Sequence, residues 1–269
     1  MKLPVNIHQI PIINYHKISV RNDVGITTRH PADFKRDMQL LRQEGYQTVT
    51  FADLLSGDPL PEKPVIVTFD DGYRCVYQQA LPVMQKLGQK GVVFIPTAYI
   101  GKENGWDVRI AGKTFAHCDE RQLIELQQAG FEIGSHGRTH RALDLLSQEE
   151  MERELNQSKQ ELKTLLGKEP VSICYPFGRF DLTIISAAKD AGYRFGAASL
   201  YFKLNLNGLS HFALRRFNIY RFESSERLRA KLRMNFNSWR GYRDWLIQQG
   251  AKATVFYQKR ILKFYQQRN

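Results

Sequence analysis

The sequence predicts an α/β fold built on a parallel sheet that is either open or closed into a barrel. Short apolar runs alternate with longer amphipathic segments from residue 10 to residue 220, which is the pattern of repeated βαβ units. A chain of 269 residues is long enough to bury one substantial core. The candidate catalytic side chains all follow the ends of apolar runs, where the sites of α/β barrels lie.

The first half of this pattern contains four short apolar runs and two helix-like segments. In residues 32–44 the apolar positions Phe34, Met38 and Leu41 recur at helical spacing, and Gly45 ends the segment. Gly88 ends the second segment in the same way. We therefore expect strands at residues 10–15, 47–51, 64–69 and 91–95, and helices at residues 32–44 and 76–87.

The second half repeats the alternation, and capping residues mark its helix starts. Asp119 precedes one helix, and Ser147 with Glu150 has the pattern of a capping box before another. Residues 99–118, with glycines around Trp106, predict a long loop near the mouth of the barrel. We expect strands at residues 131–134, 171–175, 193–197 and 214–220, and helices at residues 120–129, 147–166 and 182–191.

The composition is that of a soluble globular protein, with 42% hydrophobic and 25% charged residues. No stretch reaches the roughly 18 apolar residues that span a bilayer, and the first residues lack an apolar block of secretory type. The cysteines, Cys75, Cys118 and Cys174, are odd in number and widely spaced, which is typical of reduced thiols. If Met1 is the native start, these features predict a cytoplasmic protein.

Positive charge is concentrated in the last part of the chain. Residues 1–211 hold 25 Lys and Arg against 24 Asp and Glu, whereas residues 212–269 hold 14 against 3; together they give the net charge of +12. In residues 221–269 the cations alternate with aromatic side chains such as Trp239 and Trp245. We expect a basic helical extension, which either packs its aromatics on the barrel or contacts an anionic membrane peripherally. The sequence has no nucleic-acid-binding motif, so we expect no nucleic acid partner.

Two pairs of polar residues carry the candidate chemistry. Asp70 and Asp71 follow the expected strand at residues 64–69, and adjacent buried carboxylates are costly unless a cation or proton shares their site. His136 and His140 follow the expected strand at residues 131–134, and their spacing of four lets both imidazoles face one point. Two histidines and one carboxylate, with one position open, form the ligand set of a catalytic zinc site.

Three motifs resemble those of the NodB-like polysaccharide deacetylases, carbohydrate esterase family 4. The matching segments are Thr68-Phe69-Asp70-Asp71-Gly72, Ser135-His136-Gly137-Arg138-Thr139-His140 and Tyr175-Pro176-Phe177-Gly178. They arrive in the order and spacing of the family, and the resemblance is nearest to the branch that acts on poly-N-acetylglucosamine. It implies a distorted (β/α) barrel with seven strands, to which residues 221–269 add the basic helical extension.

The resemblance also implies a role for each matching residue. Asp71, His136 and His140 would bind a divalent metal, and Asp70 would be the general base. The metal and the backbone N–H of Phe177 would stabilise the oxyanion, so we place Tyr175, Pro176 and Phe177 at the substrate. The ligand set suits zinc, while cobalt, manganese or nickel fit it nearly as well.

The chain departs from the family at two places. Cys174 stands where many members have an arginine that orients the base, and we expect Arg215 or Arg216 to reach the site from the last strand, with Arg215 as the predicted substrate-site residue. After residue 211 the chain has no histidine to protonate the leaving amine. His16 resembles the N-terminal histidine that does so in the poly-N-acetylglucosamine branch, and we predict it as the catalytic acid. His8, His30, His117 and His211 we interpret as ordinary surface or loop histidines.

These observations predict a metal-dependent hydrolase that removes N-acetyl groups from a polysaccharide, an oligosaccharide or a lipid-linked glycan. The barrel would span residues 1–220 and the extension residues 221–269. Two alternatives remain open. One is a catalytically silent glycan- or membrane-binding module, suggested by the missing arginine and C-terminal histidine. The other is a hydrolase of a different C–N amide.

Overall fold

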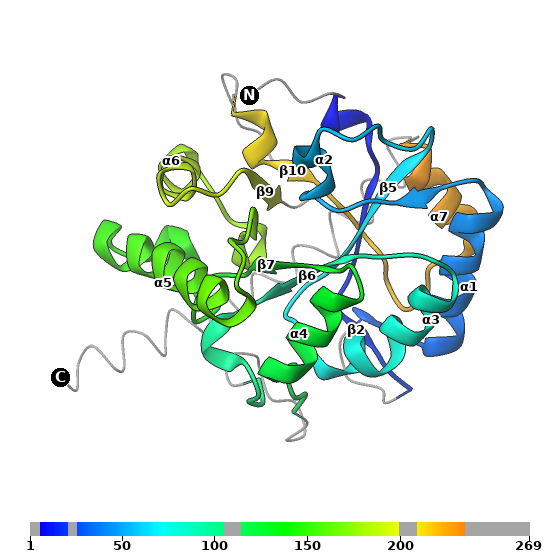
Figure 1. Cartoon of the computed structure of the whole chain (residues 1–269), viewed down its shortest axis with the longest axis horizontal. Helices are drawn as coiled ribbons and strands as arrows, with labels where there is room; N and C mark the ends of the chain where they lie inside the picture. The colour runs from blue at the N-terminus through cyan, green and yellow to red at the C-terminus, as the bar shows by residue number, and fades with distance from the viewer. Residues whose placement is uncertain (1–5, 21–25, 105–113, 199–208, 235–269) are drawn as a thin grey trace.

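A nearly closed barrel of parallel strands forms the centre of the protein. The computed structural model describes residues 6–20, 26–104, 114–198 and 209–234. The strand order is β10–β9–β8–β7–β6–β5–β1–β11, with β4 paired to the start of β5, and helices surround the strands (Figure 1). The predicted α/β barrel is thereby confirmed. The strands are β1 Ile12–Tyr15, β4 Gln47–Thr48, β5 Pro64–Phe69, β6 Val92–Ile95, β7 Glu132–Ser135, β8 Ser172–Cys174, β9 Phe195–Ala198, β10 Leu214–Arg215 and β11 Phe217–Asn218.

One short stretch of chain closes the barrel. β10 pairs with β9, β11 pairs with β1, and Arg216 lies between these two pairings. The sequence predicts one strand over residues 214–220, but the structure divides it because the chain passes here from one edge of the sheet to the other. Arg216 is therefore placed in the seam of the barrel.

The helices begin where the capping residues predict. α4 (Glu120–Gln128) and α5 (Gln148–Leu166) each start with a complete capping box, formed by Asp119 and by Ser147 with their partners. The helix expected at residues 76–87 instead starts with a π-helical turn, Val76–Ala80, because Pro82 lacks the N–H that a continuous α-helix needs. The other helices are α1 Pro31–Gln43, α2 Asp53–Ser56, α3 Leu81–Lys86, α6 Leu182–Asp190 and α7 Ser225–Leu232.

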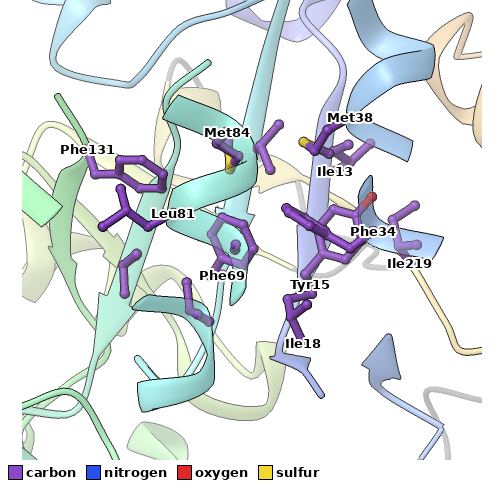
Figure 2. Packing of buried hydrophobic residues seen from close by; sticks show 14 of the residues in the cluster. Ile13, Tyr15, Ile18, Phe34, Met38, Phe69, Leu81, Met84, Phe131 and Ile219 are labelled. Atoms are coloured by element: carbon purple, nitrogen blue, oxygen red, sulfur yellow. The ribbon is translucent and has the colours of Figure 1, made fainter. Parts of the chain in front are cut away.

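Alternation along the strands separates two buried layers. On β1, Ile13 and Tyr15 point outward and pack against Phe34 and Met38 of α1 (Figure 2). A second apolar cluster contains the alternate strand residues Ile12, Ile66, Phe94 and Leu214, together with Phe51. The alternation continues to polar positions at the carboxyl ends of the strands, and it is there that the candidate site lies.

Few segments of the structure lie outside this pattern. A small parallel pair, β2 (Lys17–Ile18) and β3 (Thr28–Arg29), follows β1. From the basic extension, α7 packs Leu228 and Leu232 into the same cluster as α1. Residues 235–269, with Trp239 and Trp245, and residues 105–113 of the predicted loop lie outside the described residues. The boundary at residue 220 stays a prediction. Among the described helices, none is both long and apolar enough to cross a bilayer.

Candidate active site

The loops after two strands deliver the predicted metal ligands to one point. Asp71 follows β5, and His136 and His140 follow β7, which is two strands away across β6. One carboxylate oxygen and one ring nitrogen from each histidine all lie within 4.8 Å of one another. All three residues are buried. The structure thus brings together the three side chains that the sequence predicts as ligands, while their role as metal ligands stays a prediction.

The separations within this group match a tetrahedral metal site. The Asp71 Oδ1 atom lies 3.2 Å from His140 Nε2 and 3.5 Å from His136 Nε2. Zinc bonds to nitrogen and oxygen of about 2.0–2.1 Å place neighbouring tetrahedral donors about 3.3 Å apart. The donor set of two imidazoles and one carboxylate therefore fits zinc in both chemistry and spacing.

The tautomer of His136 also favours a cation. Its Nδ1 atom lies 2.7 Å from the Cys174 carbonyl oxygen, which can only accept a hydrogen bond, so Nδ1 carries the proton. Burial lowers the pKa of His136 to about 4, so the ring is neutral at physiological pH and Nε2 carries a lone pair. That lone pair faces the Asp71 carboxylate. Two acceptors at this distance repel each other unless a cation lies between them.

Asp70 is held by a buried arginine. Arg216 donates from Nη1 to Asp70 Oδ1 at 2.6 Å and from Nη2 to Asp70 Oδ2 at 2.9 Å, and the two residues are 5% exposed each. Burial by itself would raise the pKa of Asp70, but the charge of Arg216 outweighs it and lowers the pKa to about 2. The carboxylate is therefore ionised and fixed in orientation at neutral pH.

The prediction of Arg215 as the substrate-site residue is wrong. Arg215 is exposed, whereas Arg216 points into the barrel together with Leu214, because alternate residues of an extended chain share a face. Arg216 also donates to the Cys174 Sγ atom at 3.0 Å. The guanidinium thus lies beside the position where many family members carry their arginine, although it comes from a different strand.

A layer of polar side chains below Asp70 was not predicted from the sequence. Asn14 donates to Asp70 Oδ2 at 3.0 Å and to Asn218 Oδ1 at 2.8 Å, and it accepts from Thr68 Oγ1 and Arg216. The available signal was a polar residue inside an otherwise apolar strand, as at Asn14 in Ile-Ile-Asn-Tyr. These contacts fix the Asp70 carboxylate from below, so its open side faces the mouth of the barrel.

His16 lies at this mouth. Its Nε2 atom is 3.8 Å from Asp70 Oδ2, and its side chain is 25% exposed. Its place after β1, next to β5, brings it to the Asp70 side of the site. The structure therefore places His16 where the sequence predicts it, while its role as an acid stays a prediction.

The residues of the third motif divide into a wall and a rim. The Tyr175 side chain is fully buried, and its hydroxyl donates to the Phe212 carbonyl at 2.9 Å, so it supports the barrel wall and offers no surface to a substrate. Pro176 is buried as well. Phe177 is half-buried, and its backbone is left-handed (φ 59°). Its ring packs edge-on against that of His140, with 4.8 Å between the ring centroids. Of this motif, Phe177 is the residue whose ring contacts one of the predicted metal ligands, His140.

His117 is not the ordinary loop histidine that the sequence suggests. It is fully buried, and its Nδ1 atom donates to the Asp71 carbonyl oxygen at 2.6 Å. Burial lowers its pKa to about 4, which keeps the ring neutral. Asp71 has a left-handed backbone (φ 68°), which costs a non-glycine residue energy, and this hydrogen bond holds it there. Nothing local in the sequence marks this contact, because 46 residues separate the two partners.

Comparisons with known proteins show the family to which the chain belongs. The family model "Polysaccharide deacetylase" matches residues 57–196. The putative polysaccharide deacetylase YxkH of Bacillus subtilis is 32% identical over 195 residues, which are 71% of this chain and 64% of YxkH. A poly-β-1,6-N-acetyl-D-glucosamine N-deacetylase of Staphylococcus aureus is 22% identical over 211 residues, which are 72% of this chain and 70% of that protein.

The solved structures give the same result. The Streptococcus pyogenes deacetylase PplD, solved in complex with acetate, is similar with a TM-score of 0.70 and 27% sequence identity. The similarity covers 83% of this chain and 97% of PplD. Because the family model spans more than half of the residues, the chain belongs to the polysaccharide deacetylase family, as its motifs predict. The chain spans 64% of the length of YxkH.

Proposed function

We propose that the protein is a metal-dependent hydrolase that removes N-acetyl groups from an N-acetylated sugar. The observation that carries this proposal is the pair of adjacent aspartates with different partners. Asp71 groups with both histidines, whereas Asp70 groups with His136 and Cys174 but not with His140, and its carboxylate is bound by Arg216. This division supplies one carboxylate as a ligand and a second one as a base.

The side chains fit the steps of amide hydrolysis. A divalent metal held by Asp71, His136 and His140 would lower the pKa of a water molecule and polarise the amide carbonyl. Asp70 would accept the proton of the attacking water, since Arg216 and Asn14 hold its carboxylate toward the mouth. The backbone N–H of Phe177 would donate to the developing oxyanion. His16, beside Asp70, would protonate the leaving amine.

We propose zinc as the metal, because two imidazoles and one carboxylate are one of its catalytic ligand sets. Cobalt, manganese and nickel accept the same donors, so metal identity has to come from reloading experiments. For the substrate we propose a glycan that carries N-acetylglucosamine. The support is the name of the Staphylococcus aureus relative and the acetate in PplD, which is the product that such a reaction releases.

The silent-module alternative loses its main motivation. It depended on a missing arginine and a missing acid, and Arg216 and His16 lie beside Asp70 in their place. Hydrolysis of another C–N amide uses the same site and remains the second candidate. A cytoplasmic location and a peripheral membrane contact through the basic extension remain predictions, as does the absence of a nucleic acid partner.

Acetate release from N-acetylglucosamine oligomers tests the proposal. The protein is stripped of metal, reloaded with zinc, and assayed beside His16→Ala and beside His8→Ala, an exposed histidine of the same N-terminal segment. We expect release that requires metal, a loss of roughly 100-fold or more in His16→Ala, and no change in His8→Ala. Formamide and ureide substrates, run in parallel, separate the second candidate.

The opposite results are equally clear. Absence of acetate release with every metal, from oligomers and from lipid-linked N-acetylglucosamine, together with no hydrolysis of the formamide and ureide substrates, would favour the silent module. Full activity of His16→Ala would remove His16 from the mechanism while leaving the metal group in place.

A further inference from the structure

The loop between the two histidine ligands is sharply bent. Gly137 and His140 both have left-handed backbones, with φ values of 73° and 56°. The loop between them turns the backbone N–H groups of Arg138 and Thr139 in one direction, toward α5. Successive N–H groups that converge in this way form a concave site for an anion.

A buried glutamate from α5 occupies this site. Glu154 Oε2 accepts from the Arg138 N–H at 2.8 Å and from the Thr139 N–H at 2.7 Å, while Oε1 accepts from Thr139 Oγ1 at 2.5 Å. Glu154 is 6% exposed. Its carboxylate therefore accepts hydrogen bonds from the two residues that directly precede the predicted ligand His140.

We propose that Glu154 is a positioning residue that sets the geometry of the metal ligands His136 and His140. The inference rests on the proposed metal-dependent function. The loop is anchored at one end because His136 Nδ1 donates to the Cys174 carbonyl. Glu154 anchors the other end, so the distance between the two ring nitrogens is fixed before a metal binds. Partners outside the ligand set typically change metal affinity 10–100-fold.

The same helix offers a matched control. Glu161 lies seven residues after Glu154, on the same face of α5, and it also contacts the loop. Its contact is a salt bridge at 2.8 Å with the Arg138 side chain, and both groups are 39% exposed. Glu161 is thus an acidic residue near the same loop, but it contacts the Arg138 side chain, whereas the backbone N–H groups bond to Glu154. An effect of charge or of general loop anchoring would appear in both positions, whereas positioning would appear only at Glu154.

The test is the zinc dissociation constant of the metal-free protein, measured by competition with a chelator. We expect Glu154→Ala to raise it 10–100-fold, and Glu161→Gln to stay within about twofold of the wild type. Glu154→Gln should lie between them, because its amide oxygen still accepts from both N–H groups and its nitrogen can donate to Thr139 Oγ1. Thermal unfolding of each metal-free variant shows that the protein measured is folded.

A second variant covers the case in which Glu154→Ala does not fold. Thr139→Val removes the Oγ1 bond and keeps the shape of the side chain, and we expect it to raise the zinc dissociation constant about 3–10-fold. Lowered thermal stability but unchanged zinc affinity in Glu154→Ala would overturn the proposal, as would an effect of Glu154→Ala on zinc affinity no larger than that of Glu161→Gln. Failure of the wild type to bind zinc would instead contradict the proposed function itself.

Discussion

The two ends of the barrel each bury carboxylates, but with opposite electrostatic results. At the carboxyl end, the Arg216 guanidinium lowers the pKa of Asp70 to about 2. At the amino end, Glu132 of β7 accepts hydrogen bonds from the Ala52 N–H and the Ser172 hydroxyl, both neutral groups. Burial raises the pKa of Glu132 to about 7. The two carboxylates are 5% and 9% exposed, so burial alone does not separate them.

This difference separates a carboxylate suited to chemistry, Asp70, from one suited to a structural role, Glu132. A buried carboxylate with neutral partners prefers to hold a proton, which suits a structural role. Keeping a buried carboxylate ionised requires a dedicated cation, and here that cation is delivered by the stretch that closes the barrel. The paired aspartates, the neutral His136 and the left-handed backbone of Asp71 all gather at the same end. Three non-glycine residues with left-handed backbones, Asp71, His140 and Phe177, thus lie where the substrate is expected.

The largest expected effect comes from neutralising Asp70, the ionised carboxylate at the carboxyl end of the barrel. Asp70→Asn removes the base but keeps an oxygen for Arg216, and we expect kcat to fall by a factor of about 10²–10⁴. The measurement is acetate release by the zinc-loaded protein, with near-UV circular dichroism as a check of folding. Turnover close to that of the wild type would mean that Asp70 is not the base and that the contrast between the two ends is not catalytic.

Removing the cation tests why Asp70 stays ionised. Arg216→Met leaves a buried charge without its partner, and we expect a loss of about 3–5 kcal/mol in the free energy of unfolding at pH 7. The neighbouring Arg215→Met changes an exposed side chain and should stay within about 0.5 kcal/mol. Urea unfolding measures both. Equal losses in the two variants would show that the seam, rather than the ion pair, is what Arg216 stabilises.

At the amino end the prediction concerns pH. The pKa of Glu132 is raised from 4.5 to about 7, so its stabilising contribution is fully present below pH 4.5 and is lost as the pH rises to 7. At 1.36 kcal/mol per pKa unit the loss is about 3 kcal/mol. Glu132→Gln keeps a neutral side chain at every pH, so its stability relative to the wild type should increase by about this amount between pH 4.5 and pH 7.

Urea unfolding of the wild type and the variant at several pH values checks the expectation for Glu132. Glu152→Gln, at an exposed position, is the control, and we expect no such trend from it. A flat difference between the wild type and Glu132→Gln would mean that Glu132 is ionised in the native protein, and the contrast with Asp70 would disappear.

The smallest effect is expected from the thiol beside Arg216. Cys174→Ser replaces one acceptor of the guanidinium with another, while the two bonds to Asp70 remain. We expect the free energy of unfolding to change by less than about 1 kcal/mol and turnover to change little. A loss of turnover comparable to that of Asp70→Asn would give the thiol a direct part in the site.

Local sequence patterns predicted much of this arrangement. Asp70 directly follows β5 and His136 directly follows β7, so the strand that carries each residue also fixes where it emerges. Whether Arg215 or Arg216 points into the barrel depends on a shift of one residue, because alternate residues of an extended chain face opposite sides. The sequence does not mark where this stretch changes its pairing from β9 to β1. His117 and Glu154 escaped prediction because their contacts are made with backbone atoms of distant loops.

Zinc content measured after dialysis tests the central claim, which is that adjacent aspartates have different tasks. Wild type, Asp70→Asn and Asp71→Asn are loaded with zinc, dialysed together and analysed for metal per chain. We expect about one zinc in the wild type and in Asp70→Asn, and a large loss in Asp71→Asn, because Asp71 groups with both His136 and His140 while the Asp70 carboxylate is bound by Arg216. Equal zinc loss in both variants, or in neither, would contradict the division between ligand and base.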